Sequence, residues 1–173
     1  MDLTMAETTA ARLLEPLGRR WLHVRAVASR AIELGRALND DDAECLVAAA
    51  WLHDVGYAPQ IAVTGFHPID GARFLRSEDW PDRVVNLVAH HSGARFEAAT
   101  RGLSEALAEF PFEDPVSDAL AAADLTSGPS GERVTYDERI DEILHRYPAG
   151  DPVHQTWLIA REPMRHAVQR AHS

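Results

Sequence analysis

The stretch Trp51-Leu52-His53-Asp54-Val55-Gly56-Tyr57 places an imidazole and a carboxylate side by side at the end of an apolar run. Residues 48–52 are alanine, tryptophan and leucine, a composition typical of a buried segment. Buried polar side chains need hydrogen-bond partners, and buried charges need a counter-charge or a metal ion. Neutral imidazole nitrogens and carboxylate oxygens are common ligands of divalent first-row metals. The pair His53-Asp54 therefore predicts a metal site whose other ligands lie elsewhere in the chain.

Helical periodicity extends outward from this pair in both directions. In residues 20–38 apolar side chains recur at three- and four-residue spacing, and His23 lies on or beside that apolar stripe. Asn39 and the acidic residues 40–42 suit a helix start, and the helix that they begin leads to His53-Asp54. No segment shows a convincing strand pattern. The sequence predicts an all-α helical bundle.

The remaining segments place more histidines and an aspartate at predicted helix ends. Pro68 suits a first helical turn, which puts His67 at a helix N-terminus, and the apolar residues 84–88 lead into His90-His91. Residues 94–115 are mixed, with one short helix expected around 103–110. The apolar segment 116–125 contains Asp124, which needs a partner.

Length and composition favour one domain over residues 1–173, with a motif core at about 20–125 and C-terminal helices at 135–171 packing on it. Pro163 is a candidate point of interruption in the last of these helices. All 17 basic residues are arginine, so a lysine nucleophile is excluded, and the net charge of -10 argues against binding long nucleic acid. No membrane span or secretory signal is visible, which indicates a cytoplasmic protein. The oligomeric state stays open.

The candidate ligands share a position at a helix end or on an apolar helix face, and they are His23, His53, Asp54, His67, His90, His91 and Asp124. The order of His23, His53-Asp54 and Asp124 resembles the HD superfamily of metal-dependent phosphohydrolases over roughly residues 20–125. The additional His67-Pro68-Ile69-Asp70-Gly71 and His90-His91 resemble the HD subgroups that hold two metals. Those subgroups include HD-GYP cyclic-dinucleotide phosphodiesterases and HD-type dinucleoside-polyphosphate hydrolases.

This resemblance implies a first metal bound by His23, His53, Asp54 and Asp124. It implies a second metal that shares Asp54 and takes His67 and His90, with His91 as a weaker candidate, either as ligand or as hydrogen bonder. The donors do not distinguish Fe, Mn, Co, Ni and Zn. Each histidine alone also has an ordinary structural explanation, such as a helix N-terminus for His67 or a helix C-terminus for His90-His91. The complete set favours metal binding.

The implied function is a phosphohydrolase for a small phosphate ester or nucleotide, with His53 and Asp54 at its catalytic centre. Two ions about 3.5 to 4 Å apart can clamp a phosphoryl oxygen and generate a metal-bound hydroxide. Four arginines near the motif segments could neutralise phosphate charge, namely Arg25, Arg73, Arg95 and Arg133. Tyr57 could face the substrate or cap the loop.

Two departures argue against hydrolysis of cyclic di-GMP. Tyr57 stands where HD-GYP proteins have a lysine, and no Gly-Tyr-Pro segment follows His90-His91. Two alternatives to a hydrolase stay open. One is a di-iron HD-domain oxygenase that activates dioxygen, and the other is a non-catalytic, metal-binding regulatory module.

Overall fold

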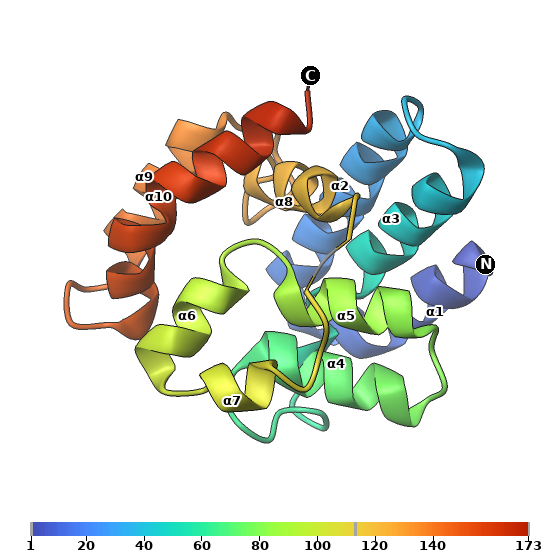
Figure 1. The fold of residues 1–173 in the computed structure, drawn as a ribbon, viewed down its shortest axis with the longest axis horizontal. Coiled ribbons are helices and arrows are strands. Elements are labelled where there is room, and N and C mark those ends of the chain that lie inside the picture. The colour runs from blue at the N-terminus through green and yellow to red at the C-terminus, as the bar shows by residue number, and fades with distance from the viewer. Residues whose placement is uncertain (1, 113, 173) are drawn as a thin grey trace.

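The computed structural model describes residues 2–112 and 114–172, and within them it is built from helices (Figure 1). The elements are α1 (Leu3–Leu14), the 3-10 helix η1 (Glu15–Leu17), α2 (Arg19–Gly35), α3 (Asp40–Leu52), the 3-10 helix η2 (Val55–Tyr57), α4 (His67–Ser77), α5 (Asp82–His90), α6 (Ala94–Arg101), α7 (Ser104–Leu107), α8 (Ser117–Leu125), α9 (Tyr136–Arg146) and α10 (Pro152–Arg170). The all-α prediction is confirmed. Residues 1, 113 and 173 of the predicted single domain lie outside the described residues, and that domain assignment stays a prediction.

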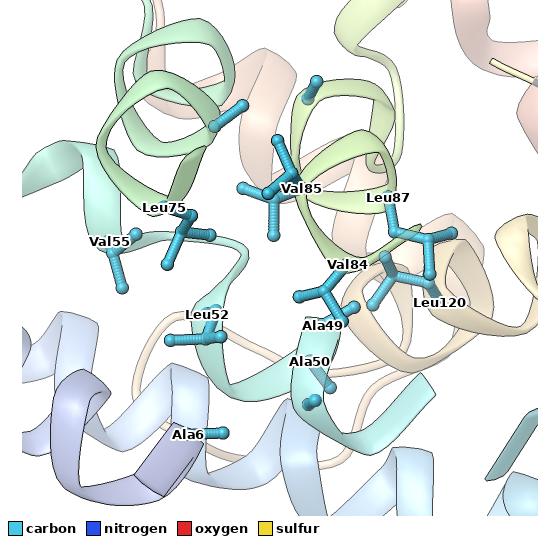
Figure 2. Close-up of a cluster of buried hydrophobic side chains, with 14 of the residues drawn as sticks. Ala6, Ala49, Ala50, Leu52, Val55, Leu75, Val84, Val85, Leu87 and Leu120 are labelled. Carbon is cyan, nitrogen blue, oxygen red and sulfur yellow. The ribbon is translucent and has the colours of Figure 1, made fainter. Parts of the chain in front are cut away.

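Helix α3 runs through the middle of the larger hydrophobic core and contacts α1, α2, α5 and α8. Figure 2 shows Ala49, Ala50 and Leu52 of α3 between Ala6 of α1 and Val84 of α5. A helix that is apolar on nearly all sides is stable only when it is buried on nearly all sides. Alanines allow the neighbouring helices to approach closely, so the apolar run before His53-Asp54 places that pair deep in the bundle.

A second, smaller core joins α8 to α9 and α10 through residues such as Leu125, Ile140 and Trp157. Helix α8 belongs to both cores, because Leu120 and Ala123 pack into the first while Leu125 packs into the second. In Figure 1 the two C-terminal helices lie on the far side of α8 from α3. This arrangement carries Asp124 to the boundary between the two cores.

The segment 94–115 and the last helix differ from the sequence expectation. Two helices, α6 and α7, occupy the region for which the pattern indicated one short helix. Helix α10 continues through Pro163 without interruption. A proline removes one backbone donor, and the carbonyl left without it belongs to the exposed Ile159, where water can bond to it. Within the described residues, no helix is both long and apolar enough to cross a membrane.

Two glycines let η2 approach α4 closely. A Cβ atom at Gly56 would lie 2.0 Å from the carbonyl oxygen of His67 and 2.7 Å from the backbone nitrogen of Gly71. Only a residue without a side chain fits such a contact. The approach fixes the distance between Asp54, which precedes η2, and His67, which begins α4.

We expect Gly56→Ala to destabilise the protein, because its methyl group would overlap backbone that cannot move aside. Overpacking of this kind costs about 1 to 3 kcal/mol, which for a chain of this size lowers the melting temperature by about 2 to 12 °C. The matched control is Gly150→Ala, since a Cβ there has no heavy atom within 4 Å. Equal melting temperatures for the two variants would contradict the proposed close contact.

Candidate metal centre

Six of the predicted ligands come together from five helices. His23 lies within α2, His53 caps the C-terminus of α3, and Asp54 follows directly. The other three are His67, the first residue of α4, His91, which caps the C-terminus of α5, and Asp124, next to the last residue of α8. All are buried except His67, which is partly exposed. Residues distant in sequence therefore form one polar cluster inside the bundle.

The first group of ligands consists of His23, His53 and Asp54, each with one donor atom within 4.8 Å of the others. Asp124 adjoins this group, because its Oδ1 lies 3.0 Å from Nε2 of His23 and 4.0 Å from Nε2 of His53. The Oδ2 atom of Asp54 lies 3.5 Å from Nε2 of His53. Two imidazoles and one carboxylate thus lie within reach of a single divalent ion, and the carboxylate of Asp124 lies beside both imidazoles.

The second group consists of Asp54, His67 and His91, again with donor atoms within 4.8 Å of one another. Nε2 of His67 lies 3.3 Å from Oδ1 of Asp54 and 3.1 Å from Nε2 of His91. The two oxygens of Asp54 therefore contact different groups, Oδ2 the first and Oδ1 the second. A carboxylate in this position could bridge two ions.

Backbone carbonyls orient the imidazoles. Nδ1 of His53 lies 2.8 Å from the carbonyl oxygen of Ala50, and Nδ1 of His91 lies 2.6 Å from that of Val88. Because Nδ1–H donates to these oxygens, Nε2 is the nitrogen with the free lone pair, which is the usual arrangement in a metal-ligating histidine.

The buried Nε2 of His53 has no hydrogen-bond partner among the described residues. At His23 both nitrogens face acceptors, the carbonyl of Gly128 at 3.0 Å and Asp124, so a proton or a cation must lie between His23 and Asp124. An orphaned buried nitrogen among carboxylates fits a metal centre, because an ion would satisfy all of these atoms together.

The electrostatics keep the donors in the forms that bind metal. Burial alone would raise the pKa of Asp54, but the charges of His53 and Arg20 outweigh burial and hold that pKa well below its usual range. Burial likewise opposes ionisation of Asp124, and its hydrogen bond with His23 holds its pKa below the usual range. Burial lowers the pKa of His67 and of His91. Asp54 and Asp124 are therefore charged carboxylates, and burial favours the neutral imidazole at His67 and His91.

His90 does not join the cluster, and His91 lies beside Asp54 and His67 in the place expected for His90. Nε2 of His90 donates to the carbonyl oxygen of Phe110 at 2.9 Å, and its ring packs against Phe112 with 5.0 Å between ring centres. The cause is the end of α5 between these two residues. His90 keeps helical geometry, whereas His91 is the C-cap, with extended backbone that turns its side chain toward His67.

Tyr57 lies at the second group. Its ring stacks on His67 with 3.9 Å between centres and an angle of 19° between planes. The guanidinium carbon of Arg20 lies 3.7 Å from the same ring centre. Two groups this close to one ring must occupy its opposite faces, so Tyr57 separates Arg20 from His67 and contacts both.

The four arginines selected from the sequence do not line the cavity beside the cluster, which corrects that expectation. Arg25 is exposed on α2. Arg73 pairs with Glu109 at 2.5 Å, and Arg133 pairs with Glu33 at 2.9 Å. The guanidinium carbon of Arg95 lies 4.6 Å from the ring centre of Phe96. Nearness in sequence to a ligand does not fix the direction of a side chain, since residues two apart on a helix face different sides.

Sequence reasoning missed Arg20 and Ser92. Nη1 of Arg20 lies 2.8 Å from Oδ2 of Asp54, and the hydroxyl of Ser92 donates to Oδ2 of Asp124. A signal for Arg20 was present, because it precedes His23 by three residues and so shares its helix face. Ser92 has a positive φ of 50°, which the sequence does not reveal.

A cavity of about 190 Å³ opens beside the ligand cluster. Its wall includes Arg19 and Arg20 of α2, Arg139 and Arg146 of α9, and Trp157 of α10. The C-terminal helices thus face the same space as His23, Asp54, His67, His91 and Asp124. A small molecule in this cavity would contact arginines as well as the candidate metal ligands.

An all-α bundle with two carboxylate-histidine groups that share one aspartate resembles the helical bundles that hold metal ions in their cores. A family model for the HD domain matches residues 20–127, and this chain belongs to the HD domain family. The resemblance drawn from the motif residues is therefore confirmed at the level of the family.

The curated proteins include a partial relative, the tRNA (cytidine(56)-2'-O)-methyltransferase of Thermoplasma volcanium. It is 36% identical over 76 residues, which are 44% of this chain and 22% of that protein. The chain thus spans about a fifth of the length of this relative. No solved structure matches the chain significantly.

We expect the metal content of two variants to show which of the adjacent residues His90 and His91 is a metal ligand. His91→Ala should lose one bound ion per chain, whereas His90→Ala should keep the wild-type content, because its ring faces Phe110 and Phe112. The measurement is elemental analysis after chelation and reloading with Mn²⁺, with circular dichroism to confirm folding. Loss of an ion from His90→Ala alone would reverse the assignment.

We further expect His53 and Asp54 to be non-equivalent. His53→Ala removes a donor of the first group only, whereas Asp54→Ala removes the carboxylate whose two oxygens face both groups. The first variant should therefore keep one ion and the second should keep none, as measured by calorimetric titration of metal-free protein. Equal residual stoichiometry in the two variants would exclude the bridging role.

Proposed function

We propose that this chain is a metal-dependent phosphohydrolase for a small phosphorylated substrate. The observation that carries the proposal is that two groups of candidate metal ligands line the same cavity as several arginines. These arginines lie together although the protein has a net charge of -10. Arginine clusters in acidic proteins are typical of sites that recognise phosphate or carboxylate. Membership of the HD domain family supports a metal-dependent hydrolase.

The first group with Asp124 would hold one divalent ion, and Asp54, His67 and His91 would hold a second. Such ions, when bound, polarise a phosphoryl oxygen and lower the pKa of water. The role of His53 and Asp54 is to fix these ions deep in the bundle. In that role both residues are part of the catalytic centre.

Arg20 is the protein cation best placed to bind a phosphoryl oxygen. Burial opposes its charge, but the ion pair with Asp54 outweighs burial and raises its pKa, so the guanidinium stays charged. One Nη atom bonds to Asp54, and a guanidinium has further N–H donors for an oxygen in the cavity. Its contact with the Tyr57 ring holds the guanidinium plane in place.

The side chains that line the cavity support water as the attacking group. The hydroxyl of Ser92 donates a hydrogen bond to Asp124, with no histidine as its partner, and burial raises the pKa of Tyr57, so neither is an activated nucleophile. Cys45 is buried in the hydrophobic core outside the cavity, and burial raises the pKa of its thiol to about 11. In the described part of the chain, no serine or cysteine of the cavity wall has a hydrogen bond with a histidine.

The cavity favours a small ester or nucleotide over a large polynucleotide. Its volume of about 190 Å³ suits a phosphorylated metabolite, and the acidic balance of the chain disfavours a long nucleic-acid surface. The match to a tRNA methyltransferase covers 44% of this chain and does not extend the proposal to tRNA.

We expect Arg20→Gln to lower kcat/KM for phosphate release from p-nitrophenyl phosphate by about 10- to 100-fold, the effect of losing a charge-assisted hydrogen bond. Each assay uses metal-free protein reloaded with Mn²⁺, Fe²⁺, Co²⁺, Ni²⁺ or Zn²⁺. The control is Arg25→Gln, which removes an exposed arginine from the same helix.

Two results would overturn the proposal. One is the absence of metal-dependent phosphate release from a panel of phosphate esters and nucleotides. The other is substrate-dependent oxygen uptake without phosphate release, which would assign the chain to the oxygenase alternative.

A further inference from the structure

Part of the cavity wall lies outside the segment that matches the HD domain. Residues 139, 143 and 146 of α9 all line the cavity, and their spacing places them on one helix face. Two of them are arginines, and Arg19 at the start of α2 adds a third. None of the three has a hydrogen bond or ion pair with a candidate metal ligand in the described part of the chain.

These three arginines carry more positive charge than nearby carboxylates compensate. Glu142 accepts from Nη1 of Arg139 at 2.6 Å and from Nη2 of Arg146 at 2.9 Å, so one carboxylate serves both. Nε of Arg19 donates to the hydroxyl of Ser130 at 3.1 Å, and no ion pair to Arg19 is formed among residues 2–112 and 114–172.

Glu97 also lines the cavity, but Arg101 pairs with it at 2.7 Å. Three arginines against one carboxylate leave two positive charges without a counter-charge at this wall.

Arg139 provides an independent indication of a ligand. The residue is only 8% exposed, and its Nε is buried with no hydrogen-bond partner among the described residues. A buried N–H group without an acceptor is costly, and more so when the group is charged. Arg139 lines the cavity, so its guanidinium group could move toward an oxyanion bound there and donate hydrogen bonds to it.

We propose that Arg19, Arg139 and Arg146 bind a second anionic group of the substrate, separate from the phosphoryl group that is cleaved. The substrate class is then a phosphate ester that carries another phosphate or a carboxylate. This inference rests on the proposed phosphohydrolase function and specifies its substrate. Arginine guanidinium groups bind such planar or tetrahedral oxyanions through paired N–H donors.

The first experiment measures anion binding without catalysis. Inorganic pyrophosphate is titrated calorimetrically into metal-free protein, where no turnover occurs. Arg139→Gln should weaken binding about tenfold or more, and Arg139→Lys should recover part of the loss because it restores charge without the guanidinium fork.

The matched control is Arg161→Gln. Arg161 of α10 pairs with Asp141 of α9 and does not line the cavity. Equal affinity in wild type and Arg139→Gln would overturn the proposal. If Arg139→Gln does not fold, Arg19→Gln supplies the same test, because Arg19 is exposed at the start of α2.

The second experiment compares pentane-1,5-diol bisphosphate with the corresponding monophosphate. The wild type should show a higher kcat/KM for the bisphosphate, and Arg139→Gln and Arg146→Gln should each reduce the ratio of the two values about tenfold. A ratio of one in the wild type, or a ratio unchanged by both substitutions, would overturn the second-anion site. Failure to hydrolyse either ester would instead contradict the phosphohydrolase proposal, and the pyrophosphate titration would still decide the binding site.

Discussion

The structure depends on a buried carboxylate, Asp54, whose two oxygens face different sets of imidazoles. Oδ2 lies 3.5 Å from Nε2 of His53 and Oδ1 lies 3.3 Å from Nε2 of His67. A charge in this position is tolerated only with cations or hydrogen-bond donors around it. The apolar helix α3 places Asp54 inside the bundle, and the close contact at Gly56 holds α4 near it. Fold and site therefore constrain each other at this residue.

Local helix geometry supplies much of the order in the cluster. His53 and His91 both cap helix C-termini, and each donates Nδ1–H to a carbonyl oxygen three residues earlier. The same hydrogen bond satisfies a carbonyl at the helix end and leaves Nε2 free for the centre. Imidazole orientation is thus set by the ends of α3 and α5, before any ligand binds.

This locality explains how far the sequence could predict the site. The apolar run before His53-Asp54 and the helix periodicity around His23 and Asp124 are local patterns, and the resemblance to HD proteins joined them into one set. The roles of His90 and His91 depend on which residue ends α5. A shift of the helix end by one residue would change which imidazole faces the cluster, and a sequence pattern does not fix a helix end that closely. The positions of Arg139 and Arg146 in the cavity wall depend on long-range packing, because α9 is held near the site by the second core that it shares with α8 and α10.

Helix α8 links the two hydrophobic cores. The helices of the first core carry the candidate metal ligands, and those of the second core carry part of the cavity wall. Residues of α8 pack into both cores, and Asp124 near its end contacts His23. The candidate metal ligands all lie within residues 20–127, the segment that matches the HD domain. Arg139, Arg146 and Trp157 lie beyond that segment but line the same cavity. Substitutions in the C-terminal helices can therefore alter what the cavity accepts while the ligand cluster keeps its geometry, because α9 and α10 pack in the second core whereas α3, α4 and α5 pack in the first.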